Sequence, residues 1–427
     1  MIPAMPDTID ALYAFAVAAL VAGVLVPPSR ALARRIGAID QPKERGLHTV
    51  PMPKLGGVAI LGGVLAAGLL GAIAFGWLPW GDQMKAIIAG AVVIAAVGVA
   101  DDVFDLPPGW KLLGQVVAVV IPVSQGVKVQ TFTLPFLGGL RPASVDLFEL
   151  PVIGTVDLGF VGTVIGIVAI VNVINFIDGV DGLAAGVCLI AAATFAVIAL
   201  SLDRNAAGVL AALTAGAALG FLWHGFPPAS SFMGDTGSNL LGYMLGAIAV
   251  QGALKTNAVV ALFFPLIVLA VPILDSGFVV AKRLKYRRPI YVGDRSHFHH
   301  RMANIGFSQR RTLAYLYGWA LVLAGLALAL RFVPYSDDRG NFDPLWTTVM
   351  VACSLVALAA SVYLVEVLEI LKLRRFRLQE IGLLRRSAGQ PPPEPEEVDE
   401  GVAQELETGE FPATDPDTGE FEIVERR

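Results

Sequence analysis

Long apolar runs recur along nearly the whole chain, and they constrain its fold more than any other feature. Crossing a hydrocarbon core of roughly 30 Å takes about 20 consecutive helical residues. Runs of about this length lie near residues 8–28, 57–77, 83–100, 110–126, 159–177, 183–202, 206–224, 239–254, 258–281, 312–332 and 346–371. The 427 residues are 55% hydrophobic and only 16% charged, which argues against a water-soluble globule. We therefore expect an all-α polytopic membrane protein with about eleven transmembrane helices.

Lys and Arg concentrate in three segments, and their distribution predicts the orientation of the helices. Residues 29–56, residues 282–311 and the stretch after the last span are strongly basic, whereas the loops on the other side carry only scattered cations. Short cytoplasmic loops carry an excess of Lys and Arg. We therefore predict that the three basic segments share the cytoplasm, with the N-terminus outside and the C-terminus in the cytoplasm.

We expect residues 1–375 to form one transmembrane domain. Its predicted cytoplasmic loops are 29–56, 101–109, 178–182, 225–238 and 282–311. Residues 376–427 are acidic and rich in Pro, so we expect a cytoplasmic, largely disordered tail. The outward segment 127–158 alternates apolar and polar residues around glycines, which is typical of a hairpin. Cys188 and Cys353 lie in apolar runs, so we expect neither a disulfide framework nor a thiolate metal site.

Carboxylates and carboxamides gather at the predicted cytoplasmic ends of the spans, where charged groups are costly and call for a functional explanation. They are Asp101, Asp102 and Asp105 at the third span, Asn172, Asn175, Asp178 and Asp181 at the fifth, and Asp235 at the eighth. The predicted orientation rests on Lys and Arg alone, so the finding that these carboxylates and carboxamides all lie on the predicted cytoplasmic side is an independent observation. Mg²⁺ usually takes one or two carboxylates and leaves its other positions to waters and substrate phosphates. We interpret the cluster as a Mg²⁺ site for phosphate chemistry, with a plain helix-end charge cluster as the alternative.

Two further motifs fit this interpretation, each with an alternative that the residues leave open. The string NVINFIDGVDGL spaces Asn172, Asn175 and Asp178 at steps of three, so one side of a helix end could bind metal and nucleotide together. Interhelical hydrogen bonding by intramembrane Asn is the alternative. The string RSHFHHRM could bind zinc through its histidines. Its flanking Arg295 and Arg301 would repel a cation and attract phosphate, which favours a diphosphate-binding loop.

Five strings, in this order and spacing, resemble the polyprenyl-phosphate N-acetylhexosamine-1-phosphate transferases of glycosyltransferase family 4, integral membrane enzymes that begin lipid-linked glycan synthesis. The strings are DQPKERGLHTVPMPKLGG at 40–57, DDVFDLPPGWK at 101–111, NVINFIDGVDGLAAG at 172–186, FMGDTGSNLLG at 232–242, and PILDSGFVVAKRL with DRSHFHHRM at 272–302. The HFHHR form is similar to the branch that uses UDP-N-acetylglucosamine and undecaprenyl phosphate. The muramoyl-pentapeptide branch shows a different His-rich string.

The resemblance implies a role for each candidate residue. The catalytic residues would be Asp101, Asp102 and Asp178, the first two at the acceptor phosphate and the metal. Mg²⁺, for which Mn²⁺ is a substitute, would be held by Asp102, Asn175 and Asp235. Lys111 would contact the diphosphate, and Asn172 and Asp181 would lie near the nucleotide. The remaining substrate-binding residues, in the histidine loop, would be Arg295, His297, His299, His300 and Arg301.

The implied reaction moves N-acetylglucosamine-1-phosphate from UDP-N-acetylglucosamine to a polyprenyl phosphate and releases UMP, at the cytoplasmic face of a bacterial inner membrane. A phosphate monoester has a second pKa of about 6, so the acceptor needs no strong base, and Asp101 would orient it or take a residual proton. The expected partners are the two substrates and the lipid bilayer, with no nucleic acid. The sequence leaves open whether the protein forms a homodimer. The alternatives are a phospho-N-acetylmuramoyl-pentapeptide transferase and an ion-coupled transporter, whose site would lie near the bilayer midplane.

Overall fold

The chain divides into two compact units. The computed structural model describes residues 8–41, 51–130, 132–134, 138–140, 142–151, 154–252, 265–285, 298, 302, 306–335 and 342–364. The first unit comprises Met1–Leu274 and Leu313–Pro334, and the second comprises Asp275–Thr312 and Tyr335–Arg427.

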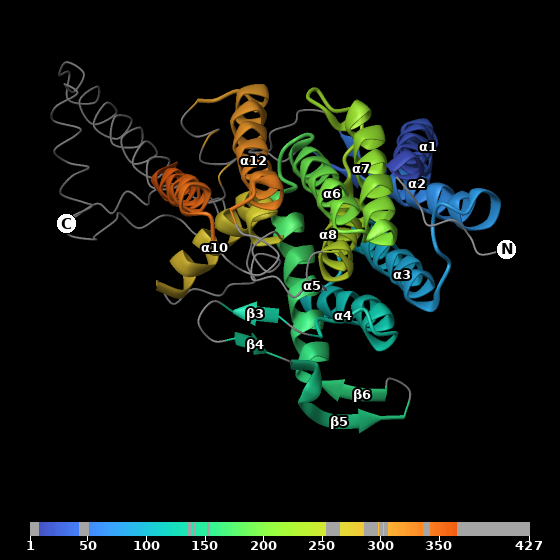
Figure 1. Ribbon diagram of the computed structural model, residues 1–427. Coiled ribbons are helices and arrows are strands. Elements are labelled where there is room, and N and C mark those ends of the chain that lie inside the picture. Colours follow the sequence, from blue (N-terminus) through green and yellow to red (C-terminus); the bar gives the residue numbers. More distant parts are fainter. Residues whose placement is uncertain are drawn as a thin grey trace, which may run out of the picture. The chain divides into compact units, whose positions relative to one another are not determined.

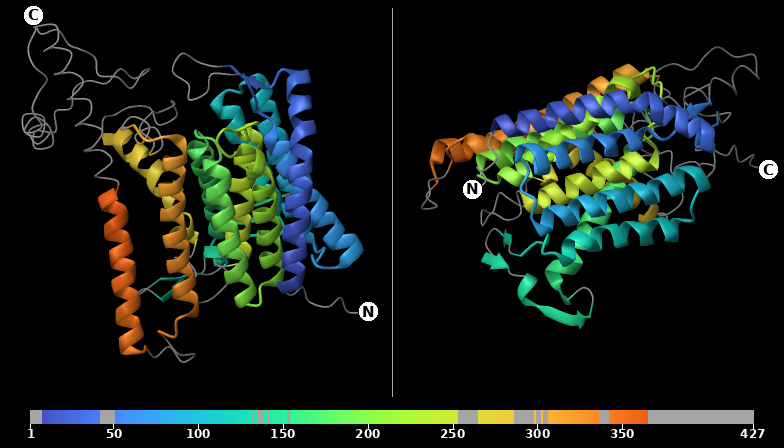
Figure 2. Two further views of the ribbon diagram at one scale, coloured as in Figure 1. Left: turned by 90° about the horizontal axis from the view of Figure 1, so that it is seen from above. Right: turned by 90° about the vertical axis from the view of Figure 1, so that its right-hand side faces the viewer.

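The first unit is a bundle of helices that follow the predicted spans in order (Figures 1 and 2). The helices before segment 127–158 are α1 (Thr8–Ile36), α2 (Gly56–Leu70), α3 (Asp82–Phe104) and α4 (Pro108–Ser124), with a π-helical turn, Gly71–Phe75, extending α2. Those after it are α5 (Leu158–Ile177), α6 (Leu183–Ser201), α7 (Asn205–Gly225) and α8 (Gly234–Gln251). Two of the boundaries between the units fall inside helices. Helix α10 (Ala270–Lys285) begins in the first unit and ends in the second, and α12 (Gln309–Phe332) begins in the second and ends in the first.

In the described part of the chain, 8 helices are long and apolar enough to cross a membrane. They are α1, α2 with its π-helical turn, α3, α5, α6, α7, α12 and the helix Pro344–Leu364 of the second unit. By contrast, α4 and the apolar start of α10 are shorter, and the first turns of α8 are polar. A polytopic helical membrane protein is confirmed, whereas the total of about eleven spans and the orientation stay predictions.

Helix α1 has small residues inside and large apolar residues outside. Its buried face against α2 and α7 includes Ala14, Ala18 and Ala22, whereas Leu20 and Val24 are 69% and 64% exposed. Small residues allow close helix packing where lipid is the solvent, because burial of large apolar side chains brings little gain there. The exposed face of α1 is therefore suited to lipid contact.

Helix α1 is also longer than predicted. The predicted span stopped at residue 28, but the helix continues through Pro27 and Pro28 to Ile36. Pro27 lacks an N–H, so the carbonyl of Gly23 loses its helical partner. The ring nitrogen Nε2 of His224, on α7, lies 3.1 Å from that carbonyl oxygen and takes the partner's place. The predicted loop 29–56 thus begins as helix.

Helix α8 lies at the centre of the first unit. Every residue from Thr236 to Val250 is buried, and the helix packs against α2, α3 and α5. Deep in this packing, the hydroxyl of Tyr243 donates to the carbonyl oxygen of Ile87 at 2.9 Å. The polar groups in the first turn of α8 therefore lie at the start of a helix that packs against α2, α3 and α5.

Segment 127–158 forms two antiparallel hairpins where one was predicted. Strand β3 (Phe132–Leu134) pairs with β4 (Gly138–Leu140), and β5 (Asp146–Leu150) pairs with β6 (Gly154–Asp157). Asp157 ends the second hairpin, forms an ion pair with Lys128, and caps α5 by accepting the Phe160 N–H at 2.7 Å. A third short pair, β1 (Ile39–Asp40) with β2 (Met52–Pro53), follows α1.

The second unit holds part of one family string. Asp275 is buried, and one of its carboxylate oxygens accepts the Phe298 N–H at 2.6 Å. Residues 376–427, predicted to be a disordered tail, lie outside the described residues, so that prediction is untested.

Candidate active site

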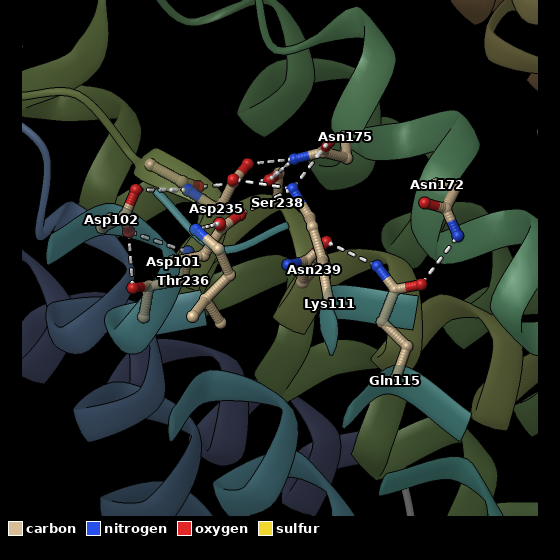
Figure 3. A network of polar contacts seen from close by, with 12 residues as sticks. Asp101, Asp102, Lys111, Gln115, Asn172, Asn175, Asp235, Thr236, Ser238 and Asn239 are labelled. Carbon is tan, nitrogen blue, oxygen red and sulfur yellow. Dashed lines mark hydrogen bonds and ion pairs between the residues drawn. The ribbon is translucent and has the colours of Figure 1, made fainter. Parts of the chain in front are cut away.

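A lysine ammonium lies among polar side chains of neighbouring helices (Figure 3). Lys111 Nζ, at the start of α4, donates to Asp235 Oδ2 at 2.7 Å and to Asn175 Oδ1 at 3.4 Å. It also forms an ion pair with Asp101 Oδ2 at 2.9 Å. The partners come from α3, α5 and α8, so four helices meet at one cation. The side chains of Lys111 and Asp101 are only 18% and 8% exposed, which distinguishes this cluster from a weak surface ion pair.

The turn between α3 and α4 brings Lys111 back beside Asp101. Helix α3 ends at Phe104, where Asp105 adopts a left-handed conformation with φ of 48°. The N–H of Leu106 then donates to Asp101 Oδ1 at 2.9 Å. Helix α4 begins at Pro108, where a proline fits because no N–H partner is required in the first turn. The string DDVFDLPPGWK thus specifies a helix end, a tight turn and a new helix.

The carboxylate of Asp102 caps α8 across the helix interface. Its Oδ1 accepts the Asp235 N–H at 2.9 Å, and its Oδ2 accepts the Thr236 N–H at 3.0 Å. The hydroxyl of Thr236 also donates to Oδ2, at 2.7 Å. Because the first N–H groups of a helix have no intrahelical partner and carry partial positive charge, an acidic cap stabilises this helix start.

Gly234 permits this capping contact. Its φ of +68° is a conformation that glycine adopts readily, and an added Cβ would lie 2.2 Å from Lys54 O and 2.5 Å from Asp102 Oδ2. The helix therefore begins at Gly234, earlier than the predicted span from residue 239, and Asp235 lies in its first turn.

Replacing Asp102 with asparagine is expected to lower both stability and turnover. One carboxylate oxygen would become an NH₂ group facing N–H and O–H donors, leaving buried polar groups unpaired at a cost of about 1–3 kcal/mol. Thermal unfolding in detergent and product formation measure the two effects. Asp105→Asn is the matched control, because Asp105 is exposed in a conformation that Asn tolerates. An Asp102→Asn protein with an unchanged unfolding midpoint would contradict the capping role.

Asn175 and Asp178 lie where α5 ends. The amide Nδ2 of Asn175 donates to Asp235 Oδ1 and, at 2.9 Å, to Ser238 Oγ. Asp178, one residue past the helix, lies near the carboxylates of Asp235 and Asp102. Burial raises the pKa of the Asp178 carboxyl well above its usual range, and the neighbouring negative charge of Asp235 adds to the effect.

Asn172 and Asp181 lie apart from the lysine. The amide of Asn172 donates to Gln115 Oε1 at 2.8 Å and to the Val168 carbonyl oxygen at 2.8 Å, deeper in the bundle. This is the interhelical hydrogen bonding that the sequence left open. Asp181 Oδ2 accepts the Ala229 N–H at 3.1 Å and so connects the loop after α5 to the loop before α8.

The structure therefore brings together most of the candidate residues that it describes. Asp101, Asp102, Lys111, Asn175 and Asp235 form one hydrogen-bonded group (Figure 3). The histidine-loop candidates, Arg295, His297, His299, His300 and Arg301, lie outside the described residues, so their roles stay predictions.

Four polar residues of the network were missed in the sequence. Thr236 and Ser238 contact Asp102 and Asn175, and the other two, Gln115 and Asn239, lie deeper and contact each other at 3.4 Å. The sequence contained a signal for the last two. Gln115 follows Lys111 by four positions and Asn239 follows Asp235 by four, so each lies one helical turn from a candidate residue on the same helix face.

The oxygen atoms around the Lys111 ammonium are of the kind that also bind a divalent metal ion. Among the described residues, no group of three or more His, Cys, Asp or Glu side chains is arranged to hold a metal. The carboxylates of Asp101 and Asp235 and the amide oxygen of Asn175 nevertheless converge on one cation. One or two carboxylates are what Mg²⁺ usually takes from a protein, so these residues fit it.

Fold and site together define a polytopic membrane protein with a buried, charged centre made by helix ends. Residues 84–253 match the family model described as glycosyl transferase family 4. A probable undecaprenyl-phosphate N-acetylglucosaminyl 1-phosphate transferase of Bacillus subtilis is 36% identical over 318 residues, 74% of this chain and 84% of the relative. A decaprenyl-phosphate N-acetylglucosaminephosphotransferase of Mycobacterium tuberculosis is 34% identical over 348 residues, 74% of this chain and 82% of the relative. The chain belongs to glycosyl transferase family 4 and is a hexosamine-1-phosphate transferase.

Proposed function

We propose that this protein transfers N-acetylglucosamine-1-phosphate from UDP-N-acetylglucosamine to a polyprenyl phosphate such as undecaprenyl phosphate, releasing UMP. The names of the two N-acetylglucosamine-transferring relatives support the sugar and the lipid. The single structural observation that carries the proposal is the half-buried Lys111 shared by Asp101, Asn175 and Asp235, since a cation among oxygen ligands is suited to diphosphate chemistry. We place this site at the cytoplasmic face of a bacterial inner membrane.

The residues of the centre would act mainly by positioning and charge. Lys111 would bind an oxygen of the diphosphate, exchanging part of its contact with Asp235 for the substrate. Asp101, beside Lys111, would orient the acceptor phosphate and accept a residual proton. Because the acceptor is already mostly ionised near neutral pH, its attack on the β-phosphorus needs no stronger base.

A bound Mg²⁺ would neutralise charge on the transferred phosphoryl group and on the leaving UMP. Asp235 and Asn175 would hold it, with Asp101 or Asp102 nearby. Of these two, Asp101 faces the centre, whereas both oxygens of Asp102 already accept hydrogen bonds from α8. Mn²⁺ would be a substitute with the same oxygen ligands.

The main alternative is a phospho-N-acetylmuramoyl-pentapeptide transferase. A protein of that name from Desulforudis audaxviator is 33% identical over 350 residues, 76% of this chain and 98% of the relative. A donor panel separates the two activities. An ion-coupled transporter fits less well, because the charged groups lie at helix ends and not at mid-helix.

Purified protein in lipid nanodiscs is expected to form UMP from UDP-N-acetylglucosamine only when polyprenyl phosphate is also present. EDTA should abolish the reaction, and added Mg²⁺ should restore it fully, with Mn²⁺ restoring part. UMP release and the lipid-linked product are measured together by chromatography, with the Asp235→Asn protein as the blank. Turnover of UDP-N-acetylmuramoyl-pentapeptide in place of UDP-N-acetylglucosamine would show the alternative activity, and full activity in EDTA would overturn the metal assignment.

A further inference from the structure

Three carboxamides lie one helical turn deeper in the bundle than the charged centre (Figure 3). They come from α4, α5 and α8, the same helices that supply Lys111, Asn175 and Asp235. Helices α4 and α8 begin at the charged centre and α5 ends there, so each carboxamide is displaced toward the interior of the bundle. We call these residues the amide tier: Gln115, Asn172 and Asn239.

Hydrogen bonds join the amide tier across three helices. Asn172 Nδ2 donates to Gln115 Oε1 at 2.8 Å, and Gln115 Nε2 donates to Asn239 Oδ1 at 3.4 Å. Gln115 and Asn239 are fully buried. Inside a membrane-spanning bundle no bulk water competes for these groups, so the hydrogen bonds fix how the three helices are rotated relative to one another.

Stability alone does not explain this tier. The Nδ2 group of Asn239 is buried and has no hydrogen-bond partner among the described residues. Burying an unpaired donor is unfavourable, and leucine, which is similar in size, would remove it. Leucine would also remove the acceptor of Gln115 Nε2, so the number of unpaired buried donors would stay the same and asparagine gains no clear stability advantage here. Local violations of this kind are expected where a sequence serves function.

We propose that the amide tier positions Lys111, Asn175 and Asp235 for catalysis. The tier would touch neither substrate; it would hold each helix at the rotation that brings its polar group to the shared centre. The inference rests on the proposed function, because it assigns the charged centre to phosphoryl transfer. Displacing a reacting group by about 1 Å can lower turnover about 10²-fold, so small rotations are enough.

Asn239→Leu separates this role from a purely structural one. We expect the unfolding midpoint to stay close to the wild-type value, because the unpaired Asn239 Nδ2 disappears while Gln115 Nε2 loses its acceptor, so one unpaired buried donor replaces another. We also expect kcat to fall at least about tenfold, while KM for both substrates changes less than about twofold. Thermal unfolding and steady-state kinetics in the same nanodiscs measure all three quantities.

A matched pair of glutamine variants tests the same point. Gln115→Leu breaks the tier, whereas Gln83→Leu breaks an amide contact between α3 and α8 at their other ends, where Gln251 Nε2 donates to Gln83 Oε1 at 3.1 Å. Gln115→Leu loses two interhelical amide hydrogen bonds and Gln83→Leu loses one, so both should lower the unfolding midpoint. Only Gln115→Leu should lower kcat, again about tenfold or more.

The kinetics use whichever UDP-sugar the wild-type protein turns over. A wild-type protein that is inactive with UDP-N-acetylglucosamine but active with another donor would overturn the proposed sugar and leave the positioning role testable on that donor. An Asn239→Leu protein with wild-type kcat would overturn the positioning role. So would a kcat that simply follows the unfolding midpoint across the three variants.

Discussion

Replacing Asp235 with asparagine is expected to lower kcat by about 10²–10³-fold while the protein remains folded, the loss seen when one preorganised electrostatic group is removed from an active site. The Asp235 carboxylate accepts from both Lys111 and Asn175, and it opens the central helix α8. Asparagine keeps the shape of the side chain but removes its charge. Among the described residues, the ammonium of Lys111 would keep Asp101 as its one carboxylate partner, and the centre would lose a proposed ligand of Mg²⁺.

The measurement is kcat for UMP release, with the unfolding midpoint as a check on folding. Asp82→Asn is the matched control, because Asp82 pairs with Lys85 at 3.3 Å in an exposed ion pair at the other end of α3. That variant should keep wild-type turnover. If Asp235→Asn retained more than about a tenth of the wild-type kcat, the central role of this carboxylate would be wrong.

The sequence was sufficient to predict that Asp101, Asn175 and Asp235 meet, because they lie at helix ends. Asp101, Asn175 and Asp235 are far apart in the chain, but the distribution of Lys and Arg predicts that the three helix ends share one side of the membrane. Packing of α3 and α5 against α8 then brings these ends together, and the structure shows their contact.

The individual contacts could not be predicted in the same way. Asp101 and Asp102 are neighbours, and adjacent residues of an α-helix point about 100° apart. One therefore faces Lys111 and the other faces the start of α8, but the sequence does not say which. The start of α8 was also hidden, because Gly234 and the polar residues after it resemble a loop until Asp102 caps them.

Helix α1 gives a second case in which tertiary contact overrides a local signal. Two consecutive prolines predict a helix end. The helix nevertheless continues, and the carbonyl of Gly23, freed by Pro27, lies against His224 of α7. A partner so distant in the chain leaves no local trace in the sequence.

Replacing Gly98 with alanine is expected to have the largest effect on the architecture of the site. Gly98 lies on α3 one turn before Asp102, and an added Cβ would lie 2.4 Å from the Cα of Thr236 and 2.7 Å from the carbonyl oxygen of Asp235. These are backbone atoms of α8, so no side chain can rotate away. The two helices would have to separate, at a cost of about 1–3 kcal/mol for overpacking. The cap of α8 and the contact between Asp101 and the centre would both be strained.

Gly166→Ala is the matched control for this prediction, because Gly166 lies within α5 and an added Cβ meets no atom within 4 Å. Alanine is the better helix former, so this variant should keep or slightly raise the unfolding midpoint. Gly98→Ala should lower the midpoint and reduce turnover by about 10²-fold, since a shift of about 1 Å between α3 and α8 misaligns two of the four helices. Equal midpoints and equal turnover for the two variants would mean that the close approach of α3 to α8 does not hold the charged centre together.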